Sequence, residues 1–109
     1  MALLHTAHIS FYEGTPEETR QHIFQMYQTL AEDCGGADAG ILFWRTGWNR
    51  DLREKLGKVW HIAETAIFLD DDALQAFRVH PAHVALTTIL RECADWTVGD
   101  IKITLPLNI

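Results

Sequence analysis

Hydrophobic and polar residues alternate with a period of two in four short segments, which predicts four strands. These segments are residues 4–11, 41–46, 58–68 and 98–105. The third is the clearest and divides into two faces. One face carries Val59, His61, Ala63, Thr65 and Ile67, and the other carries Trp60, Ile62, Glu64, Ala66 and Phe68. We assign the His61 face, together with His5 of the first strand, to the side covered by helices.

A helical pattern follows the first strand and extends over residues 16–33. Its apolar stripe consists of Ile23, Phe24, Tyr27, Leu30 and Ala31. Two signals predict its start: a capping box formed by Thr15 and Glu18, and Pro16 at the first helical position. The adjacent glycines 35 and 36 predict its end, because glycine adopts the left-handed conformation of a helix C-cap.

Two further helices are predicted between the third and fourth strands. Asp70 provides an N-cap for residues 71–78. Pro81 begins a second helix over residues 81–94, directly after His80. The polar segment 47–57 is then a long hairpin connection.

The order β-α-β-β-α(α)-β predicts a single α+β domain over residues 1–109 with a ferredoxin-like sandwich, in which helices cover one face of an antiparallel sheet. The opposite face, which we assign to Trp60, Ile62, Ala66 and Phe68, is too apolar to remain in water. We therefore expect a homodimer that forms through this sheet face. Glu64 in that face requires a partner or a wet interior.

Composition narrows the class of partner. The formal net charge is -6, and the basic residues do not form a continuous patch, so nucleic acid is not an expected partner. No long apolar stretch and no signal-peptide pattern occur, so we expect no membrane association. Cys34 and Cys93 form no CxxC motif, which favours free thiols and a cytoplasmic location.

Several segments resemble the stress-responsive dimeric α/β barrel (Dabb) family. They are His5 at the start of the first strand, the strand Trp60-His61-Ile62 to Phe68, and Ala76-Phe77-Arg78-Val79-His80-Pro81-Ala82-His83-Val84. The resemblance covers about residues 3–105. It implies a ferredoxin-like fold whose sheets pair into a dimeric α+β barrel, in a family where many members have no assigned activity.

The resemblance also implies site residues. One type in the family, a plant polyketide cyclase, uses a tyrosine–histidine pair without metal or cofactor. His83 stands at the histidine position and Phe77 at the tyrosine position, where phenylalanine cannot donate a hydrogen bond. The other residues that match the cyclase pocket are His5, Phe24, Tyr27, His61 and His80. Tyr27 is a candidate replacement for the missing hydroxyl.

The sequence therefore favours a pocket that binds a small hydrophobic or aromatic carbonyl compound. His83, at the start of the last helix, is the candidate general base, and His5 is a second catalytic candidate. Cyclase, isomerase or lyase chemistry without a metal or other cofactor would fit, since no HExxH motif is present. Two alternatives stay open: a non-enzymatic stress-response or structural dimer, in which the histidines only satisfy backbone groups, and a cofactor-independent monooxygenase.

Overall fold

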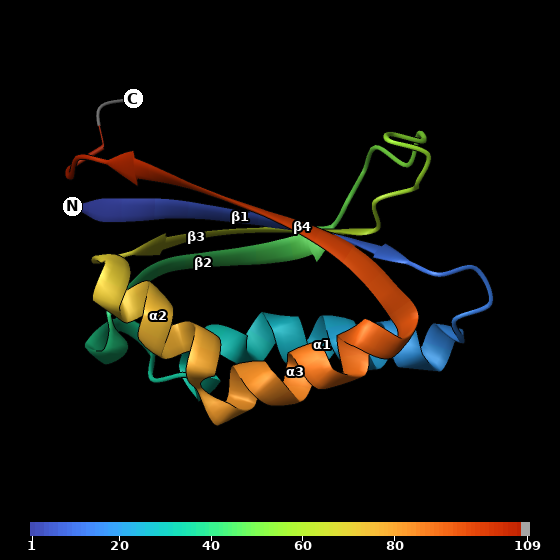
Figure 1. Ribbon diagram of the computed structural model, residues 1–109, viewed down its shortest axis with the longest axis horizontal. Helices are drawn as coiled ribbons and strands as arrows, with labels where there is room; N and C mark the ends of the chain where they lie inside the picture. The colour runs from blue at the N-terminus through green and yellow to red at the C-terminus, as the bar shows by residue number, and fades with distance from the viewer. Residues whose placement is uncertain (108–109) are drawn as a thin grey trace.

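The computed structural model describes residues 1–107, which form one antiparallel sheet with helices on one face (Figure 1). In chain order the elements are β1 (Ala2–Phe11), α1 (Glu17–Asp33), a short 3-10 helix η1 (Gly36–Ala39), β2 (Ile41–Trp48), β3 (Ile62–Phe68), α2 (Asp71–Val79), α3 (Pro81–Cys93) and β4 (Ala94–Ile103). The strand order is β2-β3-β1-β4. This topology confirms the predicted ferredoxin-like α+β fold.

The starts of β3 and β4 each differ from the prediction by four residues. β3 begins at Ile62 rather than at residue 58, because residues 49–61 form a loop held by side-chain bonds. In this loop the Trp60 indole N–H donates to the Lys55 carbonyl at 2.8 Å, and the Asn49 amide donates to the Trp60 carbonyl at 2.9 Å. β4 begins at Ala94, four residues early, because it pairs with β1 along the whole of that strand.

The helix ends follow local hydrogen bonding. The Asp70 carboxylate accepts from the Ala73 N–H at 2.8 Å, so the predicted cap of α2 is confirmed. The predicted capping box of α1 is wrong, and Pro16 lies at the N-cap rather than inside the helix. Thr15 instead donates its hydroxyl to the carbonyls of Tyr12 and Cys93, which ties the start of α1 to the end of α3.

The register between β1 and β3 corrects the predicted faces. Leu3 lies opposite Phe68 and Ala7 lies opposite Glu64, so odd-numbered residues of β1 share a face with even-numbered residues of β3. The face that carries Ile62, Glu64, Ala66 and Phe68 therefore packs against the helices, and its assignment to the open side was wrong. The physical reason is burial: this apolar set completes the core, and Ile62, Ala66 and Phe68 are each 0% exposed.

In the described part of the chain no helix covers the other face of the sheet, and the loop of residues 49–61 rises beside it (Figure 1). In register on this open face lie Leu4 opposite Ile101 and Phe43 opposite Ile67. Phe43 is 37% exposed and Ile101 is 59% exposed. Within residues 1–107, no helix combines the length and the apolar character needed to cross a membrane.

Candidate functional site

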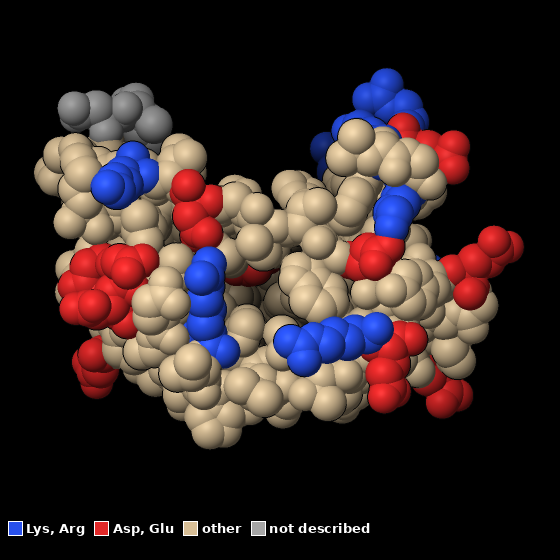
Figure 2. Space-filling model, viewed as in Figure 1, with Lys and Arg blue, Asp and Glu red and all other residues tan. Residues whose placement is uncertain are grey.

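A cavity of about 500 Å³ lies between the sheet and the helices. β1, β3 and β4 contribute one wall, and α1, α2 and α3 contribute the other. Figure 2 shows a hollow in the middle of the viewed face, with charged side chains at its edge. Arg78 of α2 and Arg91 of α3 are among the lining residues. A mostly apolar cavity with a few convergent polar groups is the usual form of a small-molecule site.

His83 lines this cavity from the first turn of α3. Its Nδ1 lies 3.1 Å from the carbonyl oxygen of Arg78. Because a carbonyl only accepts, Nδ1 carries the proton and Nε2 keeps its lone pair. Burial is the main influence on the imidazole and lowers its pKa below the ordinary value. His83 is therefore held as a neutral base with one fixed tautomer.

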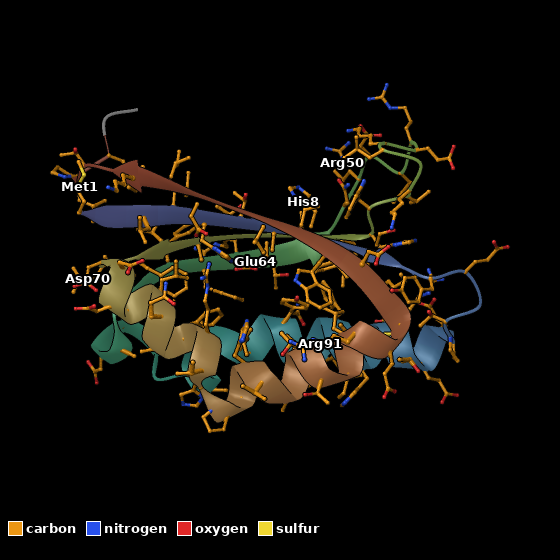
Figure 3. All side chains as sticks on the ribbon, viewed as in Figure 1. Met1, His8, Arg50, Glu64, Asp70 and Arg91 are labelled. Carbon is orange, nitrogen blue, oxygen red and sulfur yellow. The ribbon has the colours of Figure 1, made fainter. Side chains whose placement is uncertain are left out.

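Glu64, His5 and Asp100 lie close together on the sheet side. Figure 3 shows Glu64 in the space between the sheet and the helices. The His5 Nδ1 lies 2.6 Å from Asp100 Oδ1, and its Nε2 lies 3.8 Å from Glu64 Oε1. Burial, and then the charge of Asp100, raises the pKa of Glu64 to about 8. Glu64 is thus an uncharged acid near neutral pH.

Tyr27 and Phe77 complete the part of the cavity that the resemblance identified. Both are buried and both line the cavity. The Phe77 ring lies 4.6 Å from the His83 ring, measured between centroids. Burial first, and the charge of Glu64 second, raises the pKa of the Tyr27 hydroxyl, so it stays protonated and can donate a hydrogen bond.

Three predicted site residues lie outside the lining of this cavity. Phe24 stacks on Trp48 with centroids 4.5 Å apart. His80 caps α3, since its Nδ1 accepts from the Ala82 N–H at 3.1 Å. His61 lies at a separate hollow of about 420 Å³ beside Arg20.

His61 lies in the loop before β3, so the β1–β3 register does not place it; its ring packs beside Phe11 at the end of β1, close to Arg20 of α1. His61 Nδ1 accepts from the Phe11 N–H at 3.0 Å. Burial, followed by the nearby positive charge of Arg20, lowers its pKa. His61 is thus fixed at the end of β1, where it serves the strand rather than the cavity.

Sequence reasoning missed the cavity residues Glu64, Arg78 and Arg91, and it also missed Asp100, which contacts His5. A signal for Glu64 existed, because it is the one acid in the alternating apolar set of β3. Asp100 and the two arginines lie on exposed positions of β4, α2 and α3, where a charged residue is ordinary. Among residues 1–107, no group of three or more His, Cys, Asp or Glu side chains is arranged to hold a metal ion.

Sequence comparison gives one family and one curated relative. The family model described as the Stress responsive A/B Barrel Domain matches residues 3–103. An uncharacterized protein of Streptomyces coelicolor, SCO4036, is 33% identical over 68 residues, which are 62% of this chain and 67% of the relative.

Structure comparison finds similar folds at low sequence identity. A dimeric ferredoxin-like protein of unknown function from Bacteroides fragilis has a TM-score of 0.71 at 21% identity and covers 94% of this chain and 96% of its own. A hydroxynitrile lyase from Passiflora edulis gives 0.73 at 12%, covering 98% and 97%. SnoaB, a cofactor-independent oxygenase from Streptomyces nogalater, gives 0.64 at 19%, covering 97% and 98%. At these identities the likeness shows the shared fold.

Proposed function

The chain belongs to the stress-responsive A/B barrel domain family, and from this premise we propose that it is a homodimer with a ligand cavity in each subunit. The ligand is a small hydrophobic or aromatic carbonyl compound. The reaction is proton transfer without a cofactor, with His83 as general base. One observation carries this proposal: His83 presents a neutral imidazole beside the cavity, with its tautomer fixed by the Arg78 carbonyl.

The geometry assigns the chemistry to one nitrogen. Nδ1 of His83 is bonded to the backbone, so Nε2 is the atom that can accept a proton from a bound ligand. The lowered pKa keeps this nitrogen unprotonated at neutral pH. Removal of a proton from the carbon next to a carbonyl moves electron density onto the carbonyl oxygen. The resulting enolate can close a ring, move a double bond or expel a leaving group.

The residues that line the cavity favour an uncharged, partly aromatic ligand. Phe77, Trp96 and Leu90 provide apolar surface, and the rings of Phe77 and His83 are already in contact. A hydroxynitrile lyase has a similar fold. The fold therefore accommodates lyase chemistry in that protein, which is 12% identical to this chain.

The dimer part of the proposal rests on the open face of the sheet. Leu4, Phe43 and Ile101 place apolar surface on this face, and the loop of residues 49–61 rises at its side. Similar structures from Bacteroides fragilis and Thermobifida fusca are described as dimeric. A second copy of the sheet therefore fits this face better than solvent does.

The test uses acetophenone as the probe. In deuterated water the protein should accelerate exchange of the acetophenone methyl protons, followed by proton NMR, and the rate should saturate with acetophenone concentration. His83→Ala should lower the protein-catalysed rate by about a hundredfold or more, a typical contribution of a general base. His22→Ala, an exposed position on α1, is the matched control and should behave as the parent protein.

Two results would contradict the proposal. Exchange at the same rate in His83→Ala would remove His83 as the base. A structural dimer would instead be indicated if the parent protein neither binds acetophenone nor exchanges its protons, and if His83→Ala lowers thermal stability.

A further inference from the structure

Glu64 is a buried acid with an unsatisfied oxygen. It lies on β3, one of the two central strands, and is 4% exposed. Among the described residues, only two buried side-chain oxygens have no hydrogen-bond partner, Glu64 Oε1 and Thr46 Oγ1. These two residues lie opposite each other in the β2–β3 register. A buried polar atom without a partner is costly, so its retention calls for an explanation.

β1, β4 and the helices α1, α2 and α3 each contribute a titratable or charged group near Glu64. His5 of β1, Asp100 of β4, Tyr27 of α1, Arg78 of α2, and His83 and Arg91 of α3 are the titratable or charged groups near the cavity. Within residues 1–107, no arginine or lysine forms an ion pair with Glu64, and His5 Nε2 at 3.8 Å is too distant for a hydrogen bond. Arg78 instead lies 3.5 Å from Asp100.

We propose that Glu64 acts as a carboxylic acid that donates a hydrogen bond to the carbonyl oxygen of the ligand. This proposal rests on the proposed function and adds the donor that the chain lacks at Phe77. Burial favours the required protonated form, because the pKa of Glu64 is raised to about 8. A protonated carboxyl is a strong donor at the place where negative charge develops.

His83 and Glu64 together take up and supply every proton that the reaction moves. His83 Nε2 takes a proton from the carbon next to the carbonyl, and the electrons of that C–H bond form a C=C bond. The π electrons of the C=O bond move onto oxygen, which takes the Glu64 proton and gives an enol. Glu64 is then a carboxylate and His83 an imidazolium, and both return to their first state when the proton steps reverse on the product. No oxidant, reductant or metal is required.

Tyr27 is the competing donor. Its hydroxyl also lines the cavity and also stays protonated. The two donors differ in titration, because Glu64 loses its proton near pH 8 whereas burial keeps the phenol protonated above that range. A pH titration of the hydrogen bond therefore separates them.

The experiment measures the hydrogen bond on the probe itself. Acetophenone labelled with carbon-13 at the carbonyl is bound to the full chain, and its NMR shift is followed from about pH 6 to about pH 9.5. Donation to the oxygen moves the carbonyl signal downfield. In the parent protein this downfield shift should disappear with a midpoint near pH 8.

The variants have distinct expected results. Glu64→Gln keeps an N–H donor without a titrating proton, so its downfield shift should be independent of pH. Glu64→Leu should lose the shift at every pH and lower the methyl exchange rate by about a hundredfold. Glu32→Gln, an exposed position on α1, is the matched control and should reproduce the parent titration. Glu64→Gln keeps the size of the side chain, so it tests the proposal even where Glu64→Leu does not fold.

Each remaining result overturns a different statement. Loss of the shift in Tyr27→Phe together with its retention in Glu64→Leu assigns the donor to Tyr27 and overturns the role of Glu64. Saturable binding to the parent protein without a downfield shift of the carbonyl signal also overturns the role of Glu64. It leaves the cavity as a binding site. Absence of saturable binding overturns the carbonyl-ligand function, and the donor role falls with it.

Discussion

At the scale of single residues, two histidines three positions apart differ in chemistry because their ring nitrogens have different backbone partners. His80 Nδ1 accepts a hydrogen bond from the Ala82 N–H, so its lone pair is used to start α3. His83 Nδ1 faces the Arg78 carbonyl, so its proton is used there and the lone pair of Nε2 remains available. The same residue type thus serves as a cap in one case and as a candidate base in the other.

The buried carboxyl of Glu64 makes stability depend on pH. Its pKa is raised to about 8 in the folded protein, against 4.5 as the ordinary value. Between these values the folded chain holds a proton that the unfolded chain has released, so the free energy of unfolding falls as pH rises through this window. Glu64→Gln removes this dependence. We expect its stability relative to the parent to increase by up to about 4 kcal/mol between about pH 5 and about pH 8.5.

Urea denaturation at both pH values measures this difference. Glu32→Gln serves as the reference, because it makes the same substitution at an exposed position of α1. A constant difference between Glu64→Gln and the parent protein at all pH values would show that Glu64 has an ordinary pKa in the fold.

At the scale of elements, the sequence predicted the type and order of the strands and the main helices, whereas the register that joins them was not accessible from alternation alone. Alternation divides β3 into two faces but does not say which face meets His5. The antiparallel pairing of Leu3 with Phe68 decides it, and this pairing brings Glu64 to the cavity. The predicted His83 and Tyr27, placed by helix position, line the cavity, while His61, in the loop that precedes β3, lies outside its lining.

The cap of α3 gives a prediction for His80. His80→Ala removes the acceptor for the Ala82 N–H and should lower stability by about 1 kcal/mol, as the loss of other helix caps does. His80→Asn should retain most of this stability, because an asparagine oxygen also caps helices. Thermal unfolding measures the stability, and the acetophenone exchange rate of His80→Asn should equal that of the parent protein. A loss of exchange in His80→Asn would instead place His80 in the site.

The junction between η1 and β2 depends on Gly40. Its φ is +82°, and a Cβ at this position would lie 2.7 Å from Cβ of Ala73 in α2. Gly40→Ala therefore combines a left-handed backbone with a steric clash, and we expect a loss of about 2 kcal/mol or more in urea denaturation. Gly47→Ala is the matched control, because a Cβ there meets nothing within 4 Å and should change stability by less than about 1 kcal/mol. Equal losses in the two variants would contradict this account.

At the scale of the whole molecule, the one-sided arrangement of the helices separates two tasks. The helix side holds the core and the cavity, with His5, Glu64 and His83 all contributed by the same chain. The other side presents the open sheet face, where His8 also points (Figure 3). Association through the open face would therefore leave the polar groups of the cavity in place. It would also bury additional apolar surface, which adds to the stability of a domain of this size.

The open face gives the prediction for assembly. Ile101 is 59% exposed and lies opposite Leu4, so Ile101→Asp places a charge within the proposed interface. We expect a dimer for the parent protein and a dissociation constant at least about a hundredfold higher for the variant, measured by analytical ultracentrifugation. Val79→Asp is the control, because Val79 is 74% exposed but lies on α2, on the helix side. Because the cavity groups belong to one chain, the monomeric Ile101→Asp protein should still bind acetophenone. Dissociation by Val79→Asp, with Ile101→Asp still dimeric, would move the interface to the helices.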